Sequence, residues 1–229
     1  MAPIVLAVDV GGSHVKALTS NQRERRRFPS GPTLTPQQMV AGTLDAVAGW
    51  RWSRVTVGLP CPVRGGNVVS EPVNLGEGWV GFDFEAAFGK PTQVVNDAVM
   101  QAVGSYQGGR MLFLGLGTGL GSAMIVDGVI EPLELGHLPF RKKTFEDYVG
   151  ERGLQKRGKK RWRKDVFAVV EHLVAAMEPD EVVLGGGGVD ELDELPEGCR
   201  RGANENAFLG GFRLWDPVWV SKVAPVTGP

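Results

Sequence analysis

The sequence lacks most of the features that mark extracellular or membrane proteins. It has only two cysteines, Cys61 and Cys199, which lie far apart and outside any CxxC pair. We therefore expect neither a disulfide framework nor a cysteine zinc site, and a reduced, cytoplasmic setting is the simpler interpretation. No apolar run approaches the roughly 20 residues of a membrane span. The opening MAPIVLAVDV lacks a basic segment and a cleavage motif, so we expect no signal peptide.

An excess of charge of one sign is also absent. The 229 residues include 25 Lys and Arg against 26 Asp and Glu, a formal net charge of -1. This balance hides residues 141–164, which contain eleven Lys and Arg. Two interpretations stay open: a solvated loop with a helix start, or a positive surface for a phosphate polymer. A nucleic-acid interface is disfavoured, because stacking aromatics do not alternate with these charges apart from Trp162.

The patterns predict an α/β protein with a weak internal repeat. A strand, a glycine turn and a second strand open the chain at 4–19, and the same arrangement returns at 111–128. We therefore expect two α/β halves, 1–108 and 109–229, with the closing helix packed back on the first. The remaining expected strands are 23–30, 55–60, 91–97 and 181–188; the expected helices are 36–49, 98–106, 162–178 and 203–215, followed by an irregular tail.

The first glycine turn has two interpretations, a tight hairpin or a phosphate cradle. In a hairpin, glycine would be needed because it adopts the positive φ of a tight turn. In a phosphate cradle, the successive backbone N–H groups of the turn would bind the anion. The turn alone is weak evidence, but Asp9 and Lys16 favour the cradle, because an unpaired carboxylate in an apolar strand is costly. It should have a cation partner, such as Lys16 or a hydrated Mg²⁺. The pattern GxxxxGK[ST] is missing, which excludes a P-loop NTPase.

The second turn, GLGTGLG, resembles a dinucleotide fingerprint only in part. Leu120 occupies the third glycine position and a strand-like run follows, where that fold needs a helix. We interpret it as a phosphate turn to which Thr118 adds a hydroxyl. For the later cluster Gly185 to Gly188, a simple strand-to-helix bend and a close approach of the donor stay equally open.

Two further motifs carry polar side chains. In VVND, Asp97 ends a strand where a helix begins, so it is either an N-cap or a general base. In ELGH, a lone histidine is more often structural, but Glu134 and His137 together offer directional hydrogen-bond groups that suit the hydroxyls of a sugar. A zinc site at His137 is not expected, because no other ligands lie near it in the sequence.

These motifs, in this order, resemble the ROK family of sugar kinases, on the actin-like (ASKHA, ribonuclease H-like) two-lobed fold. ELGHLPF, the basic segment, PDEVVLGGGGV and NENAFLGG are similar to its polyphosphate glucokinase branch. The resemblance implies phosphoryl transfer from polyphosphate or ATP to the 6-hydroxyl of glucose. The alternatives are an ATP-dependent kinase of another hexose and a non-catalytic sugar-binding homologue.

The resemblance also implies a role for each motif. Asp97 would be the base, and Asp9 would orient Mg²⁺ through water without a direct protein ligand. The donor phosphates would contact Gly11, Gly12, Ser13, Lys16, Gly117, Thr118 and Gly119, with Gly186 and Gly187 nearby. The sugar would contact Asn74, Asn96, Asp97, Glu134 and His137.

The sequence departs from the family at three points. No cysteine-rich motif follows ELGH, so no structural zinc is expected. Val99 stands where the family usually has a second aspartate, which puts turnover in question. The chain opens at the first strand without a helix-turn-helix, so neither a repressor role nor a DNA partner is expected. A cytoplasmic homodimer acting in glycolysis, without a membrane partner, is the remaining expectation.

Overall fold

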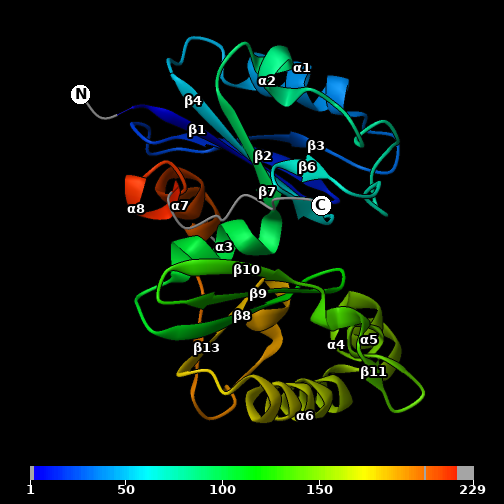
Figure 1. Cartoon of the computed structure of the whole chain (residues 1–229). Helices are drawn as coiled ribbons and strands as arrows, with labels where there is room; N and C mark the ends of the chain where they lie inside the picture. Colours follow the sequence, from blue (N-terminus) through cyan, green and yellow to red (C-terminus); the bar gives the residue numbers. More distant parts are fainter. Residues whose placement is uncertain (1–2, 204, 221–229) are drawn as a thin grey trace, which may run out of the picture. The chain divides into compact units, whose positions relative to one another are not determined.

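The computed structural model describes residues 3–203 and 205–220, which divide into two compact units (Figure 1). Unit 2 is the continuous segment Ser105–Asn206. Unit 1 joins the segment up to Gly104 with the segment from Ala207 onward. None of the helices within the described residues is both long and apolar enough to cross a membrane.

Unit 1 contains a five-stranded sheet in the order β3-β2-β1-β4-β7. Strand β1 is antiparallel to β2 and parallel to β4, and β4 is parallel to β7. The short β3 forms the edge, as the charged segment 23–30 predicted. The strands are β1 (Val5–Val10), β2 (His14–Thr19), β3 (Arg26–Pro29), β4 (Arg54–Leu59) and β7 (Thr92–Asn96), with a small hairpin of β5 (Val63–Arg64) and β6 (Asn67–Val68).

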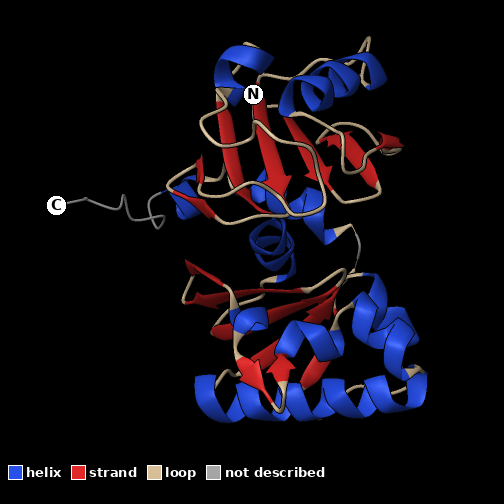
Figure 2. Cartoon of the chain, turned by 90° about the vertical axis from the view of Figure 1, so that its right-hand side faces the viewer, coloured by secondary structure: helices blue, strands red, loops and turns tan. Residues whose placement is uncertain are grey.

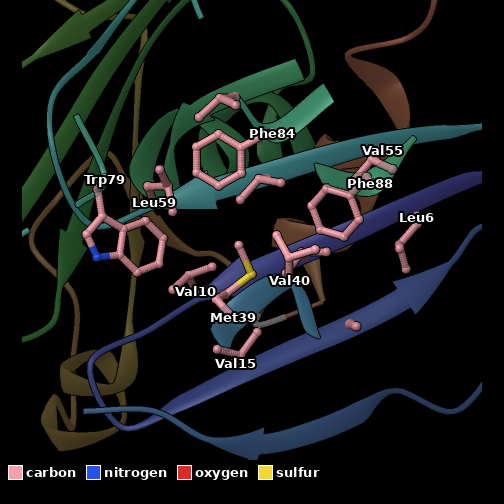
Figure 3. Close-up of a cluster of buried hydrophobic side chains, with 14 of the residues drawn as sticks. Leu6, Val10, Val15, Met39, Val40, Val55, Leu59, Trp79, Phe84 and Phe88 are labelled. Carbon is pink, nitrogen blue, oxygen red and sulfur yellow. The ribbon is translucent and has the colours of Figure 1, made fainter. Parts of the chain in front are cut away.

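Helices α1 (Pro36–Ala46) and α2 (Phe84–Phe88) cover one face of this sheet. Helix α1 begins with a capping box, in which Thr35 and the Gln38 side chain bond each other's backbone N–H groups. Alternate strand residues point toward the helices, as the period of a strand requires. Figure 3 shows this core, with Leu6, Val10, Val15, Val55 and Leu59 from the sheet beside Met39, Val40, Phe84 and Phe88 from the helices.

The other face of the unit 1 sheet carries α7 (Asn206–Arg213), which packs beside α3 (Asp97–Ser105). Thr56 Oγ1 donates a hydrogen bond to the Gly211 carbonyl at 2.7 Å, and it accepts one from Trp215 Nε1 at 2.9 Å. A short helix, α8 (Pro217–Val220), follows. The prediction of an irregular tail is therefore wrong at 217–220, and 221–229 lie outside the described residues.

Unit 2 repeats the topology of unit 1. Its sheet has the order β10-β9-β8-β13-β14, again with two antiparallel hairpin neighbours and two parallel strands. Figure 2 shows both sheets in red. The internal repeat predicted from the glycine turns is thus confirmed as a repeat of strand order and direction. The strands are β8 (Arg110–Leu116), β9 (Leu120–Val126), β10 (Val129–Leu133), β13 (Glu181–Gly185) and β14 (Cys199–Arg201).

The long helix α6 (Lys159–Met177) buries its apolar side against the unit 2 sheet. Trp162, Val166, Val169, Val170 and Leu173 are each at most 3% exposed, so the helix predicted at 162–178 is confirmed as an amphipathic helix with an earlier start. The remaining elements are η1 (Leu135–His137), a hairpin of β11 (Pro139–Phe140) and β12 (Lys143–Thr144), α4 (Phe145–Val149), α5 (Glu151–Arg157) and η2 (Gly187–Glu191).

Candidate functional site

The first glycine turn joins β1 to β2 and consists of Gly11, Gly12 and the exposed Ser13. Asp9 and Lys16 face each other across the two strands, and Lys16 Nζ donates to Asp9 Oδ2 at 3.3 Å. The Asp9 side chain is only 15% exposed, so Lys16 provides the cation partner that the sequence predicted. Neither Gly11 nor Gly12 has a left-handed backbone, and a positive φ therefore does not explain these glycines.

Asn74 lies beside this turn. Its loop is anchored by Trp79, which is fully buried (Figure 3). The Glu71 carboxylate accepts hydrogen bonds from the backbone N–H groups of Trp79 at 3.0 Å and Val80 at 3.2 Å, which closes the loop. A Cβ built on Gly12 would lie 3.5 Å from Asn74 Cβ. The structure thus brings Asn74 to the first glycine turn, although the two are far apart in the sequence.

Asn96 and Asp97 stand where β7 ends and α3 begins. Asn96 Oδ1 at 2.9 Å and Asp97 Oδ1 at 2.8 Å both accept from the backbone N–H of Ala98. Asn96 Nδ2 also donates to the Cys61 carbonyl at 3.1 Å. Both side chains therefore help to satisfy the start of the helix, and this position is compatible with general-base chemistry at Asp97 as well.

Asp97 and Asp9 occupy the same edge of the unit 1 sheet. Asp9 is opposite Gly58, which in turn is opposite Val95 in β7. A Cβ built on Gly58 would lie 3.6 Å from Asp97 Cα. Because two strand spacings separate β1 from β7, the two aspartates are roughly 10 Å apart along this edge. The carboxyl ends of parallel strands are where α/β sheets present their ligand sites.

The second glycine turn lines a pocket of about 290 Å³ within unit 2. The backbone N–H of Gly117 donates to the Gly119 carbonyl at 3.2 Å, and Thr118 is exposed. Gly187 lines the same pocket, so the structure brings this predicted donor residue to the turn. Gly186 has a different setting, because a Cβ there would lie 2.5 Å from a carbonyl oxygen of β8. The full lining is Leu116, Gly117, Thr118, Val149, Glu151, Leu154, Trp162, Gly187, Gly188 and Glu191.

The ELGH motif forms the end of β10 and the turn η1. The hydroxyl of buried Ser122 donates to the carbonyl of Leu133 at 2.9 Å and accepts from the N–H of Leu135 at 3.0 Å, which ties the motif to β9. A Cβ at Gly136 would lie 2.9 Å from a backbone oxygen of β9, so this close approach requires glycine. The side chains of Glu134 and His137 remain exposed on this fixed turn.

Glu146, on α4, is a candidate residue that the sequence did not reveal. Its Oε1 lies 3.9 Å from His137 Nε2, and a Cβ built on Gly119 would lie 2.6 Å from its Oε2. Glu146 therefore links the ELGH turn to the second glycine turn. The available signal was slight: a capping box between Thr144 and Asp147 marks the start of a short helix, but nothing marks Glu146 itself.

Burial and two neighbouring side chains affect the protonation of Glu134. Partial desolvation by the surrounding protein is the largest effect on Glu134 and raises the pKa of its carboxyl. The positive charge of His137 lowers this pKa, and the negative charge of Glu146 raises it further. Glu134 consequently takes up a proton at a higher pH than an isolated glutamate.

The basic segment 141–164 folds into the β11–β12 hairpin, α4, α5 and the start of α6. Five of its cations form ion pairs: Lys143 with Asp147, Lys159 with Glu191, Arg163 with Asp193, and Arg141 and Arg157 with Asp165. Six others are exposed and form no ion pair with the described carboxylates. These are Lys142, Arg152, Lys156, Lys160, Arg161 and Lys164.

Metal ligands are sparse. Among residues 3–203 and 205–220, no three His, Cys, Asp or Glu side chains are grouped to hold a metal ion. Asp9 offers one carboxylate that is already paired with Lys16. This donor set does not form a protein cage, but it fits a hydrated Mg²⁺, which keeps most of its waters and needs few carboxylates.

Comparison with known proteins finds similarity to sugar kinases. No protein-family model matches it. It is 28% identical over 202 residues to polyphosphate glucokinase of Mycobacterium tuberculosis (strain H37Rv). This alignment covers 79% of this chain and 76% of the relative. The crystal structure of an inorganic polyphosphate/ATP-glucomannokinase from Arthrobacter sp. strain KM superposes with a TM-score of 0.80 at 25% identity, over 93% of this chain and 97% of that one.

A second solved structure shares the fold. A ROK family glucokinase from Streptomyces griseus, in complex with glucose and AMPPNP, matches with a TM-score of 0.76 at 18% identity, over 92% of this chain and 98% of that one. The chain is therefore a homologue of the polyphosphate glucokinases, and it has the actin-like α/β fold of the ROK-family sugar kinases.

Proposed function

We propose that this chain is a glucokinase that transfers a phosphoryl group from polyphosphate or ATP to the 6-hydroxyl of glucose. The observation that carries the proposal is the placement of Asp97 on the sheet edge that also bears the Asp9–Lys16 pair and the first glycine turn. The homology to polyphosphate glucokinases supports the same reaction. Phosphoryl transfer needs mainly positioning and charge neutralisation, and these residues offer both.

In this proposal, unit 1 supplies the base and one phosphate turn. Asp97 takes the proton from the sugar 6-hydroxyl while the oxygen of that hydroxyl forms a bond to the terminal phosphorus of the donor. The bond between that phosphorus and the bridging oxygen of the donor breaks. Lys16 and the N–H groups of Gly11 to Ser13 neutralise donor phosphates. Asn74 and Asn96 hold the sugar. Mg²⁺, held through water by Asp9, would offset the negative charge of the phosphates.

Unit 2 supplies the second phosphate turn and further sugar ligands. Gly117, Thr118 and Gly119 contact the donor, with Gly187 in the same pocket. That pocket has apolar walls and two carboxylates and no Lys or Arg in its lining, a chemistry that suits the uncharged nucleoside part of ATP better than a polyanion. Glu134, His137 and Glu146 hold sugar hydroxyls.

The deciding experiment is to incubate purified protein with glucose, Mg²⁺ and either ATP or polyphosphate and to measure glucose 6-phosphate. Product with either donor supports the proposal. Product only with another hexose would indicate a different sugar kinase. Glucose binding without product would favour the non-catalytic alternative, for which Val99, buried at 3% exposure, is the motivating departure. A cytoplasmic homodimer acting in glycolysis also remains a proposal, and light scattering of the purified protein tests the dimer.

Glu134→Ala is expected to weaken glucose affinity about ten- to hundredfold, because a hydrogen bond to a charged group contributes about 1.5–3 kcal/mol. Donor affinity should hardly change. Since the pKa of Glu134 is raised, glucose affinity of the unsubstituted protein should begin to fall on acidification at a higher pH than an ordinary glutamate would give. Calorimetry with glucose and with donor at several pH values measures both effects. An equal fall in the affinities for glucose and for the donor would indicate a folding defect instead.

Polyphosphate use should depend on the exposed cations of α5 and α6. Replacing Arg152, Lys156, Lys160 and Lys164 together with glutamine is expected to raise the KM for polyphosphate roughly tenfold at low salt, because each exposed ion pair contributes about 0.2–1 kcal/mol. The KM for ATP should change less, and the difference should shrink as ionic strength rises. Arg157 and Lys159 belong to the same segment but are excluded, because they already pair with Asp165 and Glu191.

A matched control removes the same charge elsewhere. Arg23, Arg51, Arg64 and Lys90 are exposed cations of unit 1, and their joint replacement with glutamine should leave the polyphosphate KM near that of the unsubstituted protein. A rise of equal size in both quadruple variants would mean that net charge, rather than α5 and α6, governs the effect. If the unsubstituted protein gives no polyphosphate-dependent product at low salt, ATP is the donor.

A further inference from the structure

Asp165 is a charged residue within the otherwise apolar face of α6. It lies three residues after Trp162 and directly before Val166, and its side chain is only 2% exposed. Its Oδ1 accepts a hydrogen bond from Arg141 Nη1 at 2.5 Å, and its Oδ2 accepts one from Arg157 Nε at 2.5 Å. One buried carboxylate thus joins three elements: the tip of the β11–β12 hairpin, the end of α5, and α6.

The two arginines also stack on aromatic rings. The Arg141 guanidinium lies 4.6 Å from the ring centre of Phe140 and 5.4 Å from that of Tyr148. The Arg157 guanidinium lies 4.9 Å from the ring centre of Tyr148, and the two rings meet edge to face at 5.2 Å. Stacked guanidinium groups with fixed hydrogen bonds have little freedom, so the cluster also holds α4, to which Tyr148 belongs.

The hairpin and α4 are the elements that carry part of the candidate sugar site. The hairpin follows η1 immediately, and Arg141 is four residues beyond His137. Helix α4 carries Glu146, two residues before Tyr148, and Glu146 Oε1 lies 3.9 Å from His137 Nε2. Figure 1 shows the hairpin, α4 and α5 gathered at one end of the unit 2 sheet.

Resting on the proposed function, we infer that Asp165 is a positioning residue for sugar binding. It acts through Arg141 on the turn that carries His137, and through Arg157 and Tyr148 on the helix that carries Glu146. The backbone of Arg141 supports this role, because its φ of 55° is unusual for a residue with a side chain. The ion pair with Asp165 offsets this conformational cost and holds the hairpin tip in place.

Asp165→Asn tests the inference, because it keeps the shape of the side chain but leaves the two arginines without their counter-charge. We expect glucose affinity to fall about tenfold. In metal sites, loss of a residue that hydrogen-bonds a ligand costs about 10- to 100-fold in affinity, and we expect the lower end of that range. The KM for the donor should change less than twofold. Arg141→Lys is a milder second variant: it keeps the charge at a position whose side chain is 47% exposed, but it loses the planar stacking.

Val182→Ala is the matched control. It removes buried volume from the same hydrophobic core, in β13 and at 2% exposure, but changes no charged or hydrogen-bonding side chain, and it should lower stability without moving the turn. The NMR signals of the His137 ring, one of three histidines, should shift in Asp165→Asn and Arg141→Lys but not in Val182→Ala.

The outcomes separate the inference from the function on which it rests. Glucose affinity and His137 signals that change no more in Asp165→Asn than in Val182→Ala would overturn the positioning role alone. A parallel fall in the affinities for glucose and donor would overturn that role as well. A lack of glucose binding by the unsubstituted protein would overturn the proposed function and, with it, this inference.

Discussion

Replacing Asp97 with asparagine is expected to lower kcat about 10²–10⁴-fold, the usual contribution of a general base. Glucose affinity should stay within a fewfold, because the amide keeps the size and most of the hydrogen bonding of the carboxylate. Its oxygen can still accept from the N–H of Ala98, so the start of α3 should persist. Steady-state kinetics with saturating donor, together with calorimetric glucose binding, measures the two quantities separately.

Asp83→Asn is the control for this substitution. Asp83 caps α2 by accepting from the N–H of Ala86 at 2.9 Å, yet it does not lie at the carboxyl end of a strand. Asp83→Asn therefore shows how replacing an aspartate at the start of a helix affects turnover when no general base is lost. Near-normal turnover in Asp97→Asn would remove this residue from the mechanism. A matching loss in both variants would indicate a general stability effect.

The second large effect is expected at Gly210, where α7 packs against the backbone of α3. A Cβ built on Gly210 would lie 1.8 Å from the Met100 carbonyl oxygen and 2.8 Å from the Gly104 nitrogen. Both are backbone atoms, so the clash cannot be relieved by turning a side chain, and α7 must move. We expect Gly210→Ala to lower the free energy of unfolding by about 3 kcal/mol, the upper end of overpacking effects. This corresponds to roughly 6–12 °C in Tm for a chain of this size.

Thermal unfolding followed by circular dichroism measures this change. Leu209→Ala is the neighbouring control, because Leu209 lies on the same helix but is 40% exposed, and it should cost about 1 kcal/mol or less. If Gly210→Ala is as stable as the unsubstituted protein, α7 does not pack on α3 as described.

The elements with strong local patterns could be predicted from the sequence. The two glycine hairpins follow from apolar runs interrupted by glycine, and α1 and α6 follow from helical spacing with a cap or a long apolar stripe. The short α2, α4 and β11–β12 hairpin are too brief to show periodicity. They form because neighbouring parts of each unit pack against them, which a local pattern cannot reveal.

Most candidate site residues could be named from the sequence, but Glu146 and the connections among the motifs could not. The nearness of Asn74 to Gly12 depends on a loop closed by Glu71, and Glu146 acquires its place only when α4 packs beside η1. The charge of 141–164 was visible, yet the sequence could not show which cations are paired within the fold. Asp165 did carry a signal, since a carboxylate within an apolar helical stripe requires buried partners.

The position of α7 has a consequence for how the chain is made. Its residues are translated after all of unit 2, yet its glycines complete one face of the unit 1 sheet. Unit 2 is continuous, so it can form its core as soon as it leaves the ribosome. The sheet of unit 1 is synthesised earlier, but its residues Ala7 and Thr56 stay uncovered until α7 has been made. A nascent chain of this protein therefore matures out of the order of its synthesis, and its first-made domain is the one that depends longest on protection from aggregation.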